Sequence, residues 1–129
     1  MIEASLANNG YASSIQSTGS DRSIEYQAFA HVTQALTSVN RDAPDYFAKL
    51  FEALHKNLKL WTILSVEVAN DNNELPAELR ANLFYLAEFT RAHTAKVQAG
   101  KADTDVLIDI NRMVMRGLRG QTVEEGAAS

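Results

Sequence analysis

The chain has 129 residues, of which 46% are hydrophobic, and this length suits a single domain. It contains no cysteine, which excludes disulfides and thiolate chemistry. The formal net charge of −4 and the sequence pI of about 5.3 disfavour direct nucleic-acid binding, because nucleic-acid binders usually carry a basic stripe.

The two ends of the chain differ in composition from its middle. The first ten residues lack the positive start and apolar run of a signal peptide, and no apolar run approaches the length of a membrane span. We therefore expect a cytoplasmic protein. Residues 1–19 are predicted to be a flexible N-terminal segment, residues 20–119 a helical domain, and residues 120–129 a disordered tail.

Two helices are expected in the first half of the domain. The first is predicted from about Asp21 to Val39, because its apolar residues recur every three or four positions. The second is predicted from Asp42, as N-cap, to about Asn70, with Pro44 tolerated in the first turn. Its main apolar stripe comprises Phe47, Leu50, Phe51, Leu54, Leu58, Trp61 and Val68. From this stripe we expect Trp61 to be an anchor of the core.

Two further helices are expected in the second half. The third is predicted to start at Leu75-Pro76 and to stop at Gly100. The fourth is predicted from 103 or 104 to about Leu118, where Gly117 or Gly120 would end it. Because short connections favour antiparallel neighbours, the sequence predicts an all-α fold, an antiparallel bundle of about four helices with flexible termini.

Some apolar residues lie outside the predicted core stripes. Leu60 and Ile63 face away from the main stripe of the second helix, which indicates either a central helix or a surface covered by a partner. On the fourth helix, Ile108 and Met115 form a second apolar line, and Arg112 lies one turn after Ile108. We interpret these five residues as a candidate partner-binding surface. The alternative for the fourth helix is that the N-terminal segment folds back over it.

Catalytic and metal-binding patterns are weak. The three histidines, His31, His55 and His93, fall on different predicted helices. Glu52 and His55 have the spacing of a helical di-iron ligand pair, but the second copy that such a site needs does not occur. No nucleophile elbow, P-loop or dinucleotide-binding glycine pattern occurs either. We therefore expect no metal, no cofactor and no enzymatic activity.

Several short motifs occur in a fixed order along the chain. They are Tyr11, Glu25-Tyr26, Leu58-Lys59-Leu60-Trp61, Asn73-Glu74-Leu75-Pro76 with Leu79-Arg80, His93-Thr94 with Gly100, and the run from Leu107 to Leu118. Together they resemble the flagellar biosynthesis regulator FlaF family over roughly residues 11–119. Among these motif residues, structural roles are implied for Trp61, Leu75, Pro76, Arg80 and Asn111.

The resemblance implies a role in flagellum assembly in bacteria of the alphaproteobacterial type. Proteins similar to this one are linked to flagellin production and export, opposite in effect to the regulator FlbT. The resemblance therefore suggests that the chain binds flagellin as an export chaperone, since a helical bundle with spare apolar surface can hold an amphipathic helix. The alternative is a post-transcriptional regulator that acts on flagellin mRNA or through FlbT, a second candidate partner.

Overall fold

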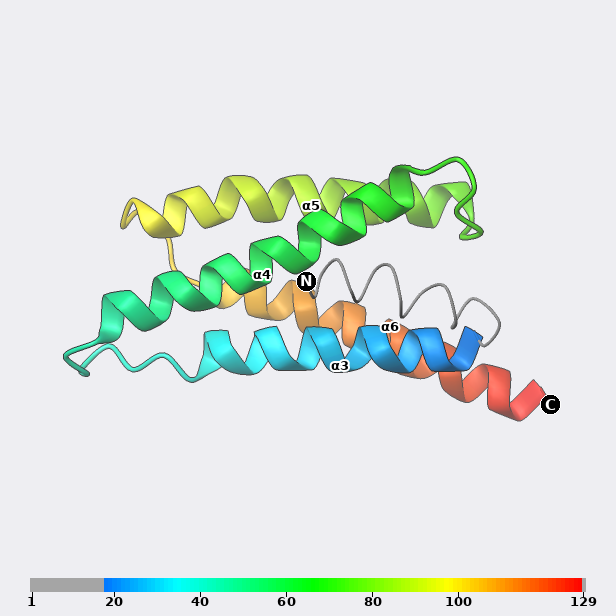
Figure 1. The fold of residues 1–129 in the computed structure, drawn as a ribbon, viewed down its shortest axis with the longest axis horizontal. Coiled ribbons are helices and arrows are strands. Elements are labelled where there is room, and N and C mark those ends of the chain that lie inside the picture. The colour runs from blue at the N-terminus through cyan, green and yellow to red at the C-terminus, as the bar shows by residue number, and fades with distance from the viewer. Residues whose placement is uncertain (1–17, 129) are drawn as a thin grey trace.

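The computed structural model describes residues 18–128, and side-chain surroundings for residues 25–118. Within this range the chain forms four helices, α3 (Thr18–Thr37), α4 (Tyr46–Ala69), α5 (Ala77–Gln98) and α6 (Asp105–Ala128). Successive helices run in opposite directions (Figure 1). The α3–α4 and α5–α6 connections therefore lie at one end of the molecule, and the α4–α5 connection lies at the other. The predicted all-α antiparallel bundle is confirmed. None of the helices in this range is long and apolar enough to cross a membrane.

The predicted ends of the domain differ from the observed ones. α6 continues to Ala128, so the predicted end near Leu118 is wrong, and most of the predicted disordered tail is helical. Gly117 and Gly120 lie within the helix because a glycine costs an interior helical position only about 1 kcal/mol relative to alanine. Of the N-terminal segment predicted to be flexible, residues 1–17 lie outside the described residues, and α3 already begins at Thr18.

The α3–α4 connection makes its own turn before α4 begins. The side-chain oxygen of Asn40 accepts the backbone N–H of Asp42 at 2.9 Å, and the Asn40 carbonyl accepts the N–H of Ala43 at 3.1 Å. These bonds hold Asp42 in a turn, so its prediction as the N-cap is wrong and α4 starts at Tyr46.

The end of α5 is formed as the sequence predicts. Gly100 has a φ of 75°, a left-handed conformation that favours glycine. Its N–H donates to the Val97 carbonyl at 3.0 Å, and the N–H of Lys101 donates to the Lys96 carbonyl at 2.9 Å. This pair of bonds is the Schellman motif, which satisfies the last carbonyls of a helix.

Side chains beyond α4 cap its C-terminal end. Nη1 of Arg80, on α5, lies 3.0 Å from the Asn70 carbonyl oxygen and 3.4 Å from that of Val68. Nδ2 of Asn73 donates to the Glu67 carbonyl at 3.1 Å. These donors satisfy carbonyls that have no partner within the helix, and Arg80 also ties α5 to α4.

The core consists of two groups of buried apolar side chains. α3 packs mainly on α6 and also on α4, whereas α4 packs mainly on α5, and α5 and α6 touch each other least of these pairs. One group lies towards the end that holds the α3–α4 and α5–α6 connections and contains Leu36, Leu50, Ala53, Leu54, Val97 and Leu107. The other contains Phe29, Trp61, Ala87 and Ile110.

A small polar network lies inside the second group. Nε1 of Trp61 donates to Oδ1 of Asn111 at 2.9 Å, and Nδ2 of Asn111 donates to Oδ1 of Asn57 at 2.8 Å. All three side chains are 0% exposed. The ring of Phe29 packs edge-on against the indole, with 5.4 Å between centroids. The prediction that Trp61 anchors the core is therefore confirmed.

Candidate protein-binding site

The first turns of α4 expose large aromatic side chains. Phe47 is 72% exposed and Phe51 is 42% exposed, although both belong to the apolar stripe predicted to be core. That part of the prediction is wrong. The stripe is continuous along the helix, but near its start the neighbouring helices cover Leu50 and leave Phe47 and Phe51 exposed. Phe47 and Phe51 instead line the wall of an open cavity.

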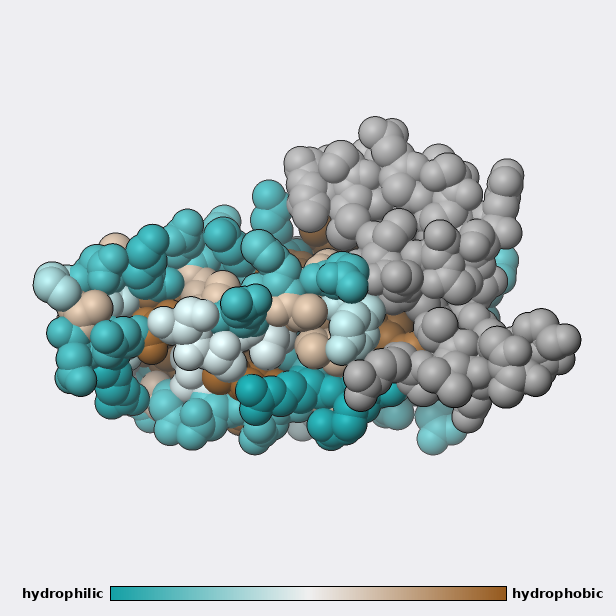
Figure 2. Space-filling model, turned by 90° about the horizontal axis from the view of Figure 1, so that it is seen from below, coloured by the Kyte–Doolittle hydropathy of each residue, from teal (hydrophilic) through white to brown (hydrophobic). Residues whose placement is uncertain are grey.

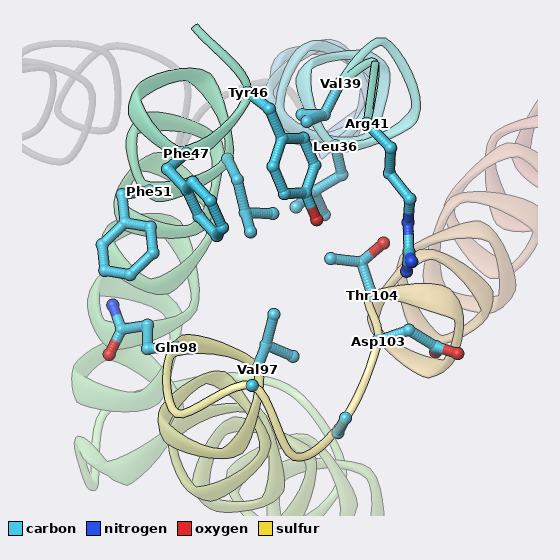
Figure 3. A pocket seen from close by; sticks show the side chains of 13 residues that line it. Leu36, Val39, Arg41, Tyr46, Phe47, Phe51, Val97, Gln98, Asp103 and Thr104 are labelled. Atoms are coloured by element: carbon cyan, nitrogen blue, oxygen red, sulfur yellow. The ribbon is translucent and has the colours of Figure 1, made fainter. Parts of the chain in front are cut away.

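The cavity lies at the end of the bundle where the α3–α4 and α5–α6 connections meet (Figure 3). Its volume is about 370 Å³, within the range of ligand pockets in proteins. Apolar side chains from α3, α4, α5 and the two connections line it. They are Leu36, Val39, Tyr46, Phe47, Leu50, Phe51, Val97 and Ala102. Figure 2 shows the molecule from below the view of Figure 1. On the described part of that face, hydrophobic residues lie between hydrophilic ones.

Tyr46 fixes part of the aromatic wall. Its side chain is half-buried and packs against the core group that contains Leu36 and Leu50. The ring of Phe47 meets that of Tyr46 at 64°, with 4.9 Å between centroids. This edge-to-face contact is favourable and holds the exposed Phe47 ring in place. Tyr46 and Phe47 therefore form a continuous aromatic part of the wall.

Two charged residues, Arg41 and Asp103, lie on the same side of the cavity, opposite Phe47 and Phe51 (Figure 3). Arg41 comes from the α3–α4 connection and Asp103 from the α5–α6 connection (Figure 3). Oδ1 of Asp103 accepts the N–H of Asp105 at 3.0 Å, and the Asp103 carbonyl accepts a hydrogen bond from Nε2 of His93 at 2.9 Å. Asp103 therefore has a structural role at the start of α6. Arg41 has no ion pair with any residue from 25 to 118.

The structure places the predicted apolar line of α6 against α3. Met115 is half-buried in the second core group, and its Sδ lies 3.9 Å from Oγ1 of Thr33 on α3. Ile108 is half-buried and packs against the first core group. The premise that these two side chains point away from the core is therefore wrong. α6 is apolar over a wide arc because it packs on α3 as well as facing α4 and α5.

The other three residues of the predicted surface do not join the apolar line of α6 in one exposed patch. Leu60 is half-buried against the second core group, as expected of a central helix. Ile63 is half-buried and belongs to neither core group, and Arg112 is exposed. The structure therefore distributes the five residues over two core groups and the surface. Their role in binding stays a prediction. Its basis, that these side chains point away from the core, no longer applies.

The five family-motif residues lie in the framework and do not line the cavity. Trp61 and Asn111 form the buried network, and Arg80 caps α4. Near Leu75, the side chain of Asn73 accepts the Leu75 N–H at 2.9 Å, and Pro76 directly precedes α5.

Sequence reasoning missed the residues around the cavity. Tyr46, Phe47 and Phe51 place three aromatic side chains in the first turns of a helix, directly after a polar connection that carries Arg41. An apolar stripe that extends to the first residues of a helix is the signal that could have revealed them, since neighbouring helices often do not cover the ends of a helix.

Neither residue of the nearby Glu52–Lys56 ion pair, 3.6 Å apart on α4, lines the cavity.

Comparison with known proteins identifies the family. The sequence model of the family described as flagellar protein FlaF matches residues 7–118. Neither the comparison with curated proteins nor the comparison with solved structures finds a match. The family match spans most of the chain, including all the residues that line the cavity. This chain therefore belongs to the flagellar protein FlaF family.

Proposed function

We propose that this flagellar protein binds flagellin and holds it for export, as a secretion chaperone does, and thereby promotes flagellin production. It acts in the cytoplasm, by binding and without catalysis. The observation that supports this proposal is the aromatic cavity at the end of the bundle, with Phe47 72% exposed at its wall. A large exposed aromatic side chain beside an apolar cavity is typical of a protein-binding surface.

The chemistry of the cavity suits an amphipathic helix. Helix-in-groove recognition uses apolar side chains one turn apart that enter a hydrophobic depression. Here Leu50 and Val97 form part of the apolar lining, and Phe47 and Phe51 can close over an inserted side chain. Terminal helices of flagellin are amphipathic and lack partners until flagellin polymerises, so they match this requirement.

Calorimetric titration of monomeric flagellin into the full chain tests the proposal. The chain is expected to bind, and Phe47→Ser is expected to weaken binding by at least about tenfold, or 1.4 kcal/mol. Tyr85→Ser is the matched control, because Tyr85 is a 66% exposed aromatic residue on α5 that does not line the cavity. Its affinity should stay within about twofold of the unmodified chain, because interface energy concentrates in a few residues. Absence of binding by the unmodified chain would refute the proposal.

The alternative function is post-transcriptional regulation through flagellin mRNA or FlbT. Copurification from cells that express flagellin, with and without nuclease, separates the two functions. Flagellin that remains bound after nuclease treatment supports the chaperone function. Loss of flagellin on nuclease treatment, or capture of FlbT in place of flagellin, supports the alternative.

A further inference from the structure

We propose that Arg41 selects the occupant of the cavity: an amphipathic helix whose apolar side chains enter the cavity and whose carboxylate pairs with the Arg41 guanidinium. This inference rests on the proposed function and adds to it the charge that the bound flagellin segment must carry. It also assigns to the α3–α4 connection a role in recognition.

The position of Arg41 supports this assignment. Its side chain extends from the α3–α4 connection along one side of the cavity, towards Thr104 and Asp103 (Figure 3). No residue from 25 to 118 forms an ion pair with it, so its guanidinium remains available. A guanidinium binds a carboxylate through two parallel hydrogen bonds, which gives directional recognition.

Asp103 limits how a partner carboxylate can approach Arg41. It lies on the same side of the cavity as the end of the Arg41 side chain (Figure 3), and its Oδ1 already accepts the N–H of Asp105. A partner carboxylate placed directly beside Asp103 would meet a like charge. The partner carboxylate therefore approaches the guanidinium from the side that faces away from Asp103.

The lining favours a protein carboxylate over a nucleic-acid phosphate. Aromatic residues such as Phe47 and Phe51 can stack on bases, but single-strand binding also needs a positively charged groove along the backbone. Arg41 is the one cationic residue that lines this cavity, and the whole chain carries a formal net charge of −4. One cation beside an apolar cavity suits one carboxylate on an apolar helix.

A charge exchange tests the inference. Arg41→Glu is measured against synthetic peptides that cover the terminal helices of flagellin, and against variants of the tightest-binding peptide in which each Asp or Glu is replaced in turn by Lys. Lys101→Glu is the matched control, because Lys101 is exposed, lies on the opposite connection and does not line the cavity. We expect Arg41→Glu to weaken binding about tenfold and Lys101→Glu less than about twofold.

One peptide variant with Lys should restore most of the affinity for Arg41→Glu while losing affinity for the unmodified chain. The effect of Arg41→Glu should also shrink as salt is raised, since exposed ion pairs are screened. Unchanged binding by Arg41→Glu, or a loss that no Lys variant restores, overturns the inference. If Phe47→Ser still weakens binding by at least about tenfold in that case, the proposed function stands. Failure of every peptide and of flagellin to bind the unmodified chain removes both proposals.

Discussion

The indole N–H of Trp61 donates to the side-chain oxygen of Asn111 at 2.9 Å in the buried centre of the bundle. The bond joins α4 to α6, two helices whose backbones come close at few positions. Nδ2 of Asn111 donates in turn to Oδ1 of Asn57, so both atoms of the Asn111 amide have partners. Nδ2 of Asn57 is buried without a partner among the described residues, so the network is satisfied at Trp61 and Asn111 and only partly at Asn57. The paired groups favour the arrangement of helices that brings them together.

Replacement of Asn111 by Ala should therefore destabilise the fold strongly. It leaves the Trp61 N–H and Oδ1 of Asn57 buried without partners, and it leaves a small cavity. We expect a loss of about 2–4 kcal/mol in the free energy of unfolding, measured by urea denaturation. Asn82→Ala is the control, because Asn82 is exposed on α5 and should change stability by no more than about 0.5 kcal/mol. Equal stability of the two variants would show that the network contributes little.

Trp61 and Phe47 allow a direct comparison of two aromatic residues on one helix. Trp61 is 0% exposed and Phe47 is 72% exposed. Trp61→Ala should cost about 3–5 kcal/mol, because it removes a fully buried side chain. Phe47→Ala should lower the free energy of unfolding by less than about 1 kcal/mol, because most of its ring remains in water in the folded state. Thermal melts of both variants check this, and a melting temperature that Trp61→Ala leaves unchanged would contradict the burial of the indole.

Met115 and Met113 test which side of α6 is covered. Met115 is half-buried beside Thr33, whereas Met113 is 47% exposed. If Met115 lay on the partner-binding surface predicted from the sequence, Met115→Glu would leave folding intact. The contact with α3 reverses this expectation, and we expect a loss of about 2 kcal/mol because a charge enters a largely apolar seam. Met113→Glu should change stability by less than about 0.5 kcal/mol. Circular dichroism melts that rank the two variants in the opposite order would mean that α3 does not cover Met115.

The sequence by itself determined the features that depend on local chemistry. The periodicity of apolar residues gave the number and approximate position of the helices, since apolar residues that recur every three or four positions mark one face of a helix. Gly100 gave the end of α5, because the left-handed conformation favours glycine whatever surrounds it. The position of Trp61 in the middle of the longest apolar stripe gave its burial.

Only the tertiary structure decided which apolar residues remain uncovered. Phe47 lies on the same stripe as Trp61, yet it lines an open cavity, because the neighbours of α4 do not cover its first turn. Met115 lies outside the predicted core stripe of α6, yet it is covered, because α3 packs along that side. Periodicity gives the direction in which a side chain points from its helix axis. Whether another helix stands in that direction depends on contacts between residues far apart in the sequence, and these the local pattern does not encode.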